Sequence, residues 1–526
     1  MSVVSYEIKM VSREYEGVAG AGGVKDVVQQ LSEALIRAGV KVKVFLPRYG
    51  FIDPLKLGFS QMDINFEADM NYAHEERREG ISFWQSTING VEIVLVESER
   101  FAEKRGVYTY TAEDEAENPM HKKGMGHFDY FAMNVLLQKA SLLYDLWTTR
   151  KTPLFHCHDG HAALIPAMMH ELDGLRQFFR DCATLITIHN AGLGYHQEVA
   201  DLPFAKANTG LPWKVINSSI LNGAFDPFLA GAQYGPINTV SENYARELQE
   251  TDIDATTGWL GHALKERGIK IEGITNGIDP DRYNPKRPEQ LGLPAGFDPL
   301  SGDMEGKRVC RQELEARIRS KRTGACVCYG TIDDAPHLPL VTSVSRLTEQ
   351  KGMDCFADAL EEVLFSRDEF RCVVLGSGAP EIEARLQSIA DNPGAKGKMA
   401  LLLGYDEAMA NLVYASGDFF VIPSRYEPCG LTDFIAQLLG NLPVVRETGG
   451  LVKTRDGFNG FTYKEFSPKA LIDALMRAIS TWKQNPDLIQ KMRKNAILNI
   501  YENYTWDKVV RKYMRLYEKA LSQKRR

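Results

Sequence analysis

The sequence predicts an α/β protein with two domains, each built on a largely parallel sheet that is covered by helices on both faces. Short apolar runs typical of buried strands alternate along the chain with amphipathic stretches of helical length. Several of these runs end in a glycine-rich or charged turn directly before a helix, which is where open α/β sheets bind ligands. The length of 526 residues is more than one core usually holds and suits about two domains.

Composition argues against several classes of function. Hydrophobic residues make up 44% of the chain and charged residues 25%, as is ordinary for a globular enzyme. The formal net charge of −7 has the wrong sign for a bulk nucleic-acid binder. No apolar run approaches the roughly 18 residues that span a bilayer, and the first residues lack a secretory signal. Most of the eight cysteines lie in apolar runs, so we expect reduced thiols and a cytoplasmic location, or a plastid one in a plant or alga.

The first half of the chain opens with a strand over residues 3–11 and a helix over 25–38, joined by a glycine-rich loop. Gly20, Gly22 and Gly23 in this loop let the backbone approach a ligand closely. The N–H groups at the start of the helix suit an anion. Further strands are expected over residues 42–46, 81–87, 90–96, 153–158 and 184–188, and a long helix over 128–147.

The boundary between the two domains is expected in a segment rich in proline and glycine, residues 286–338. We interpret this segment as a linker and the basic helix expected over 307–322 as a solvated surface element. Residues 1–285 then form the first domain and residues 339–500 the second. Aromatic residues at helical spacing predict a terminal helix within residues 501–526.

Two stretches of the second domain combine a buried strand with a charged turn. The first places Arg346 and Lys351 between an apolar run and a helix over 353–364, where two cations suit a diphosphate. The same residues have an ordinary interpretation as two solvated surface charges. The second stretch, residues 421–432, places Glu427 in the turn after its apolar run. A later strand ends in a second glycine pair, which is again suited to phosphate.

These two stretches carry a family resemblance. Residues 345–352 read Ser-Arg-Leu-Thr-Glu-Gln-Lys-Gly, and residues 423–432 read Pro-Ser-Arg-Tyr-Glu-Pro-Cys-Gly-Leu-Thr. They closely resemble the donor-site signatures of bacterial glycogen synthases and plant starch synthases, the retaining glucosyltransferases of glycosyltransferase family 5. The resemblance continues along most of the chain. It implies the GT-B architecture, in which two Rossmann-like domains face one another across a cleft and a C-terminal helix crosses back to the first domain.

The resemblance also implies roles for individual residues. His161 would hold the 6-hydroxyl of the donor glucose and would act with Arg346, Lys351 and Glu427 in catalysis. The donor-binding positions that match family motifs are Gly22, Gly23, Asp26, Asn276, Tyr405, Cys429, Gly430, Leu431, Thr432, Thr448, Gly449 and Gly450. The acceptor-side positions are His189, Asn190 and Tyr108. The implied reaction moves glucose from a nucleotide-glucose, with ADP-glucose favoured over UDP-glucose, to the non-reducing end of an α-1,4-glucan with retention of configuration.

No cofactor and no metal are expected. The segment from His156 to His161 holds three histidines and an aspartate, so a metal site is an alternative interpretation there. No aspartate-rich metal motif lies near the expected donor residues. Two cations and helix N-termini can instead neutralise a departing diphosphate. The expected partners are a nucleotide-glucose and an α-glucan, and the sequence does not specify the oligomeric state.

Three positions depart from the family pattern. Gly20 stands where the family has a lysine that touches the donor phosphates, Met133 where it has the aspartate of an Asp-Asn pair, and Gly160 where it has a tryptophan. These departures leave open a catalytically weak or inactive homologue that binds glucan or regulates other enzymes, and a related enzyme with a different donor or acceptor. Ile435 stands where sucrose- and mannose-transferring relatives carry a second glutamate, which favours a glycogen or starch synthase.

Overall fold

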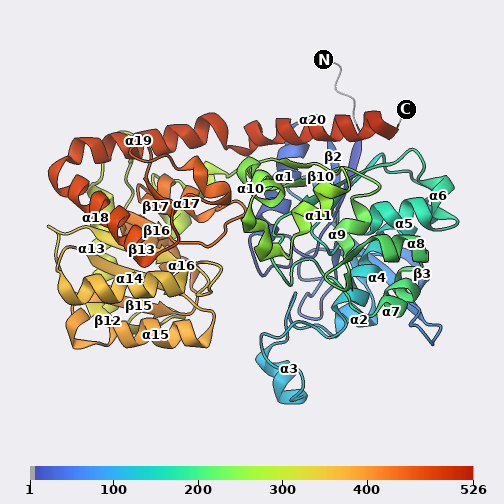
Figure 1. Cartoon of the computed structure of the whole chain (residues 1–526), viewed down its shortest axis with the longest axis horizontal. Coiled ribbons are helices and arrows are strands. Elements are labelled where there is room, and N and C mark those ends of the chain that lie inside the picture. The colour runs from blue at the N-terminus through green and yellow to red at the C-terminus, as the bar shows by residue number, and fades with distance from the viewer. Residues whose placement is uncertain (1–5, 525–526) are drawn as a thin grey trace. The chain divides into compact units, whose positions relative to one another are not determined.

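The computed structural model describes residues 6–524, and they form two compact units (Figure 1). Unit 1 contains the chain up to Gly277 together with the segment that starts at Trp506. Unit 2 runs from Ile278 to Thr505. Each unit is a mostly parallel sheet with helices packed on it, so the predicted α/β fold class is confirmed.

Unit 1 is organised on a nine-stranded sheet in the order β11-β10-β7-β6-β1-β2-β5-β4-β3. The strands from β11 to β5 run parallel, and β4 and β3 are antiparallel additions at one edge. The strands are β1 (Glu7–Val11), β2 (Lys41–Pro47), β3 (Ser60–Asp69), β4 (Arg78–Ile88), β5 (Val91–Glu97), β6 (Leu154–His158), β7 (Ala183–Ile188), β10 (Ile237–Thr239) and β11 (Ile271–Gly273). A separate two-stranded ribbon joins β8 (Ile220–Leu221) to β9 (Ala224–Phe225).

The helices of unit 1 include the two that the sequence predicts at 25–38 and 128–147. The two predicted helices are α1 and α4 in the complete set of α-helices that the structure describes in unit 1. The set is α1 (Val24–Arg37), α2 (Glu99–Ala102), α3 (Ala112–Glu117), α4 (Tyr130–Thr148), α5 (Ile165–Glu171), α6 (Leu175–Phe178), α7 (Leu202–Thr209), α8 (Trp213–Ser218), α9 (Pro227–Gly231), α10 (Glu242–Glu250), α11 (Leu260–Glu266) and α20 (Trp506–Lys524). The short helix α3 projects away from the rest of unit 1 (Figure 1). No helix within residues 6–524 has the length and apolarity needed to cross a bilayer.

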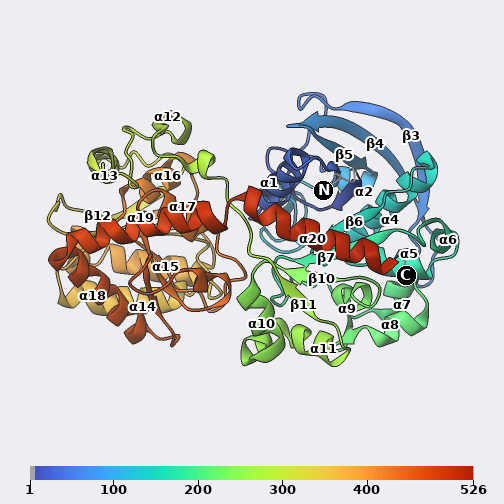
Figure 2. The ribbon, with the colours of Figure 1, turned by 90° about the horizontal axis from the view of Figure 1, so that it is seen from above.

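The last helix, α20, is an integral part of unit 1, where it packs against α1 and β7 (Figure 2). Its first residue, Trp506, donates from Nε1 to Oε1 of Gln30 on α1 at 2.7 Å. Gly277 leaves room for this indole, because a Cβ at that position would lie 2.7 Å from Trp506 Cδ2. Farther along, the hydroxyl of Tyr517 lies 2.9 Å from Nδ1 of His156 on β6. The helix therefore reaches the strands at the centre of the sheet.

Unit 2 is organised on a seven-stranded sheet in the order β12-β15-β14-β13-β16-β17-β18, parallel except for β12. The strands are β12 (Val327–Ile332), β13 (Leu340–Val344), β14 (Arg371–Gly376), β15 (Lys398–Leu403), β16 (Phe419–Ile422), β17 (Leu442–Arg446) and β18 (Phe461–Tyr463). The helices are α12 (Pro288–Leu291), α13 (Glu305–Arg319), α14 (Met353–Ser366), α15 (Pro380–Ala390), α16 (Glu407–Ser416), α17 (Thr432–Leu438), α18 (Pro468–Gln484) and α19 (Pro486–Asn503).

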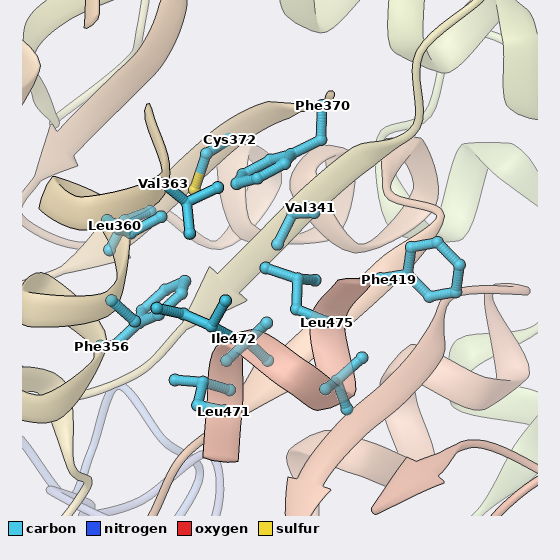
Figure 3. Packing of buried hydrophobic residues seen from close by; sticks show 14 of the residues in the cluster. Val341, Phe356, Leu360, Val363, Phe370, Cys372, Phe419, Leu471, Ile472 and Leu475 are labelled. Atoms are coloured by element: carbon cyan, nitrogen blue, oxygen red, sulfur yellow. The ribbon is translucent and has the colours of Figure 1, made fainter. Parts of the chain in front are cut away.

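Hydrophobic side chains fill both faces of this second sheet. On one face, Val341 of β13 and Cys372 of β14 meet Phe356 of α14 and Leu475 of α18 (Figure 3). On the other, α13 and α16 cover residues such as Val373. Burial on both faces explains why these strands read as continuous apolar runs rather than as alternating patterns.

The interpretation of residues 286–338 as a linker is wrong. This segment contains α12, α13 and β12, and β12 pairs antiparallel with β15 at the edge of the second sheet. The helix expected to be solvated is packed as well. Lys307 on α13 is buried, and its Nζ donates to the carbonyl oxygens of Ala415 and Leu439, both at 2.8 Å. Proline and glycine here shape tight turns within unit 2 rather than a flexible connection.

A buried ion pair lies in the core of unit 1. Lys9 on β1 is fully buried, and its ammonium pairs with the carboxylate of Asp145 on α4. Burial lowers the pKa of Lys9 to about 8, although Asp145 opposes this shift. The ammonium also lies between the rings of Phe45, Tyr144 and Phe155, with centroid distances of 4.6 to 5.0 Å. Asp145 is the carboxylate that pairs directly with this buried charge.

We expect Asp145→Asn to reduce the free energy of unfolding by about 3 to 5 kcal/mol, because it leaves a buried charge unpaired. Urea unfolding followed by circular dichroism measures the change. Asp507→Asn removes an exposed partner of Arg37 in the same unit and should cost less than about 1 kcal/mol. A loss in Asp145→Asn no larger than in this control would contradict the importance of the buried pair.

Candidate active site

In unit 2, the strand order reverses between two neighbouring strands, β13 and β16. Their carboxyl ends carry the two charged turns that the sequence singles out. Lys351 follows β13, and its Nζ donates to Oε1 and Oε2 of Glu427 at 2.9 and 2.6 Å. Glu427 follows β16 and also accepts a hydrogen bond from the hydroxyl of Ser424 at 2.9 Å. The structure therefore brings two of the predicted catalytic residues into direct contact at a topological switch point.

The environment of Glu427 keeps its carboxyl group ionised. Burial alone opposes the charge, because Glu427 is only 6% exposed. The ammonium group of Lys351 and the hydroxyl group of Ser424 outweigh this effect and hold the pKa of Glu427 below its ordinary value. At neutral pH the pair is thus a carboxylate held by a cation, and both groups can form charged hydrogen bonds with a polar ligand.

The glycine pair Gly449-Gly450 has a packing function that the sequence did not reveal. The Gly450 N–H donates to the carbonyl oxygen of Glu427 at 2.9 Å. A Cβ at Gly449 would lie 1.8 Å from that same oxygen, and one at Gly450 would lie 2.0 Å from the carbonyl oxygen of Cys429. Only glycine lets the turn after β17 lie directly against the turn that carries Glu427. Beside it, Thr448 is buried, and its hydroxyl has no hydrogen-bond partner within the described part of the chain.

The remaining donor positions of unit 2 lie at the same edge of the sheet. Arg346 is exposed in the turn after β13, and Tyr405 is 66% exposed in the turn after β15. Between the end of β16 and α17, the chain passes through the last predicted positions, which are Cys429, Gly430, Leu431 and Thr432. Every predicted position of this unit thus follows the carboxyl end of a strand.

In unit 1, a carboxylate occupies the glycine-rich loop. Oε2 of Glu14 accepts hydrogen bonds from the N–H groups of Ala21 and Gly22 at 2.6 and 2.8 Å. Its Oε1 accepts a hydrogen bond from the hydroxyl of Tyr108 at 2.5 Å. Glu14 therefore links two predicted positions, Gly22 and Tyr108, that are far apart in the sequence. It is absent from the residues predicted above, and its only signal is a charged side chain directly after the first strand.

Four histidines of unit 1 form a buried group at the ends of β6 and β7, namely His156, His158, His161 and His189. His161 stacks on the ring of Tyr108, with centroids 5.2 Å apart. His189 lies with its Nε2 2.9 Å from Nδ1 of His158. Burial lowers the pKa of His189 to about 3 and that of His161 well below its ordinary value. These imidazoles are neutral at physiological pH and can exchange hydrogen bonds with a sugar hydroxyl.

The histidine cluster does not have the form of a metal site. His156 and His158 lie two residues apart on one strand, and their rings share one face with centroids 4.1 Å apart. His156 is already engaged, since its Nε2 lies 2.7 Å from the Thr187 hydroxyl. Within residues 6–524, no group of three or more histidine, cysteine, aspartate or glutamate side chains is arranged to hold a metal ion.

The side chain of a nearby lysine lies over the glycine at position 20. The side chain of Lys25, on the first turn of α1, lies directly over Gly20, so that a Cβ there would be 2.2 Å from Lys25 Cδ. Lys25 pairs with Glu16 and lies 3.7 Å from Asp26. A lysine from the helix thus fills the space beside Gly20 that a side chain at position 20 would need.

The other two departures, Met133 and Gly160, lie near the loop that contains His196 and Gln197. A Cβ at Gly160 would lie 2.2 Å from the carbonyl oxygen of His196 and 3.2 Å from Cβ of Gln197. No larger residue fits there while the loop keeps this path. Gln197 also accepts a hydrogen bond from Nδ2 of Asn134 at 2.8 Å, next to Met133 on α4. The departure at Gly160 and the residue next to the departure at Met133 therefore contact the same loop.

Not all predicted residues of unit 1 come together. Gly23 and Asp26 begin α1 beside the loop, but Asn276 follows β11, which is the far edge of the sheet from β1. Asn276 is buried, and its Oδ1 has no hydrogen-bond partner among the described residues. Asn190 follows His189 and accepts a hydrogen bond from the Gly192 N–H at 2.8 Å, which makes it a turn residue as well.

Comparison with known families matches both units. Residues 7–276 match the starch synthase catalytic domain, and residues 338–481 match the glycosyl transferases of group 1. Among individual relatives, the glycogen synthase of Syntrophotalea carbinolica is 30% identical over 98% of this chain and 99% of its own length. The glycogen synthase of Streptococcus pneumoniae serotype 2 is 28% identical over 98% of this chain and 100% of its own.

Solved structures agree with this result. The catalytic domain of starch synthase IV from Arabidopsis thaliana, bound to ADP and acarbose, superposes with a TM-score of 0.80. It is 25% identical and covers 98% of this chain and 99% of its own. A sucrose-phosphate synthase from Thermosynechococcus elongatus, 14% identical with a TM-score of 0.57 over 98% of this chain and 100% of its own, shares the fold.

We expect Lys351→Met to destabilise the protein more at pH 7 than at pH 4.5. In the parent protein, the folded state binds the Glu427 proton less tightly than the unfolded chain, so this carboxyl stabilises the fold above its ordinary pKa and less as the pH falls. Without Lys351, burial raises the pKa of Glu427, and the folded variant regains stability as it takes up a proton at lower pH. Thermal unfolding at the two pH values measures this difference.

The matched control is Arg425→Met, which removes a cation from the turn that carries Glu427. In the parent protein this arginine pairs with the partly exposed Asp354. Its effect on the unfolding temperature should be nearly the same at both pH values. A Lys351→Met effect that is equally independent of pH would show that Lys351 does not set the ionisation of Glu427.

Proposed function

Because this chain belongs to the glycogen and starch synthase family, we propose that it lengthens an α-1,4-glucan with glucose taken from ADP-glucose. Members of this family are retaining glucosyltransferases with the GT-B fold, and this chain is a glucosyltransferase that acts on a glucan. The single observation that carries the proposal is the contact of Lys351 with Glu427 at the switch point of unit 2.

In the proposed reaction, the bond between C1 of glucose and the diphosphate oxygen breaks, and a bond forms from C1 to the acceptor 4-hydroxyl. The departing diphosphate takes the bonding electrons, and its leaving oxygen accepts the proton that the hydroxyl loses. Arg346 and Lys351 are the cations proposed to neutralise the diphosphate, a role in which fixed charges lower the barrier most. Glu427, kept ionised by Lys351, is proposed to receive hydrogen bonds from the glucose hydroxyls.

We further propose that the transfer needs no metal and no cofactor. Two positively charged side chains follow β13 on the turn before α14, and they supply the charge that a divalent cation would otherwise bring to a diphosphate. In unit 1, His161 is the residue proposed to meet the 6-hydroxyl of the donor glucose. Burial favours its neutral form, which suits a hydrogen bond to an uncharged hydroxyl.

ADP-glucose is preferred as the donor over UDP-glucose. The support is the match to starch synthase IV, whose structure contains ADP. Tyr405, 66% exposed in the turn after β15, is the residue proposed to stack on the nucleotide base. A tyrosine face accepts either base, so Tyr405 supports binding of the nucleotide and does not select adenine over uracil.

We expect the purified protein to transfer glucose from ADP-glucose to glycogen, and less efficiently from UDP-glucose. Arg346→Ala and Glu427→Ala should each lower kcat/KM by at least about 100-fold, because each removes a charged contact to the reacting glucose or its leaving group. Incorporation of labelled glucose into glycogen measures both. Arg425→Ala, which removes an arginine from the same turn as Glu427, should change kcat/KM by less than about threefold.

Transfer with either donor would also show that Gly20 is compatible with catalysis. A folded protein that binds glycogen but transfers glucose from neither donor would refute the proposal. It would favour the alternative of a homologue that binds glucan without extending it.

A further inference from the structure

A buried ammonium group lies beneath the two turns that carry most of the predicted donor positions of unit 2. Lys453 ends the 3-10 turn Gly449–Lys453, and its side chain is 3% exposed. Its Nζ donates to the carbonyl oxygens of Cys429 at 2.6 Å, Gly430 at 2.7 Å and Gly450 at 3.1 Å. One cation therefore ties the turn after β16 to the turn after β17.

The counter-charge of Lys453 is also buried. Oδ1 of Asp433, on the first turn of α17, lies 3.1 Å from Nζ, and Asp433 has no exposed surface. Gln437 donates to the other carboxylate oxygen at 3.3 Å, and the ring of Phe434 lies 4.4 Å from Nζ. Apolar residues of the same size often stabilise a core as well as a buried ion pair does. The presence of charge here is better explained by what it orients.

The hydrogen bonds of Lys453 fix the direction of two peptide groups. The C=O of one residue and the N–H of the next point in opposite directions across a trans peptide, and every peptide bond described here is trans. Since the carbonyls of Cys429 and Gly430 point toward Lys453, the N–H groups of Gly430 and Leu431 point away from it. Successive N–H groups that point to one side attract an anion.

We propose that Lys453 is a positioning residue for the nucleotide-sugar. It holds the carbonyls of Cys429 and Gly430 inward, so that the N–H groups of Gly430 and Leu431 face the diphosphate. Asp433 keeps the ammonium group under the turn and cancels its charge. This inference rests on the proposed function, and it extends the donor site to a buried pair that touches no substrate.

The experiment compares Lys453→Met with the unchanged protein, using calorimetric titration with ADP and with UDP, and steady-state kinetics with glycogen. Methionine keeps the unbranched apolar stem but donates no hydrogen bond. We expect the Kd of the nucleotide to rise about tenfold or more, and the KM for glycogen to change less than about twofold. Lys464→Met, which removes a lysine that is 85% exposed in the same unit, should change neither.

Asp433→Asn gives a second and milder variant. It keeps the size of the side chain and an oxygen near Lys453 but removes the counter-charge, so we expect a lower unfolding temperature and, in the folded protein, a Kd increase of about two- to fivefold. If Lys453→Met does not fold, this variant decides the matter, and an unchanged nucleotide affinity overturns the proposal.

Two further results would overturn it. One is a folded Lys453→Met protein that binds nucleotide like the parent, and the other is an equal loss of nucleotide and glycogen affinity, which a merely structural role would produce. The proposed function can fail while the positioning role holds. This is the outcome if the unchanged protein binds ADP or UDP but transfers no glucose, and Lys453→Met still binds the nucleotide more weakly. A parent protein that binds neither nucleotide contradicts both.

Discussion

The direction of the parallel strands is the constraint on which the rest of this structure depends. All strands of a parallel sheet end at one edge, and where their order reverses, the turns of two neighbouring strands diverge and leave room for a ligand. In unit 2 this point lies between β13 and β16, and these two strands present Lys351 and Glu427 to one another. In unit 1 the strand order reverses between β1 and β6. The glycine-rich loop follows β1, and the histidine cluster lies at the adjacent ends of β6 and β7.

Buried or partly buried ion pairs hold the turns in place at the strand ends of unit 2. Lys351 and Glu427 form one pair at the site, and Lys453 and Asp433 form a second pair beneath it. The core of unit 1 holds a third, Lys9 with Asp145. Pairs of this kind are costly to desolvate and contribute little net stability compared with apolar packing, but they tolerate few alternative arrangements. At the strand ends of unit 2 that rigidity serves the turns, because Lys453 binds carbonyl oxygens from both of them.

Two of the three departures from the family pattern lie where another residue comes close to the position of the missing side chain. Lys25 lies over Gly20, and the backbone of His196 lies against Gly160. At Gly20 the side chain that comes close is itself a lysine, the residue type that the family carries at this position. This weakens the case for an inactive homologue.

The sequence by itself determined the α/β fold class, most of the central strands and long helices, and the turns after β13 and β16. These features depend on patterns within about 15 neighbouring residues, namely apolar runs, helical periodicity and charged turns, which are readable locally. It misjudged residues 286–338, because the pairing of β12 with β15 joins positions about 70 residues apart and leaves no local signal. For the same reason, only the tertiary structure revealed that Glu14 binds Tyr108, that Gly449 and Gly450 are packing contacts, and that Lys453 lies under the donor turns. The contacts of Glu14 with Tyr108, of Gly449 and Gly450, and of Lys453 each join segments that follow different strands, and which strand ends are neighbours is decided by the order of the sheet.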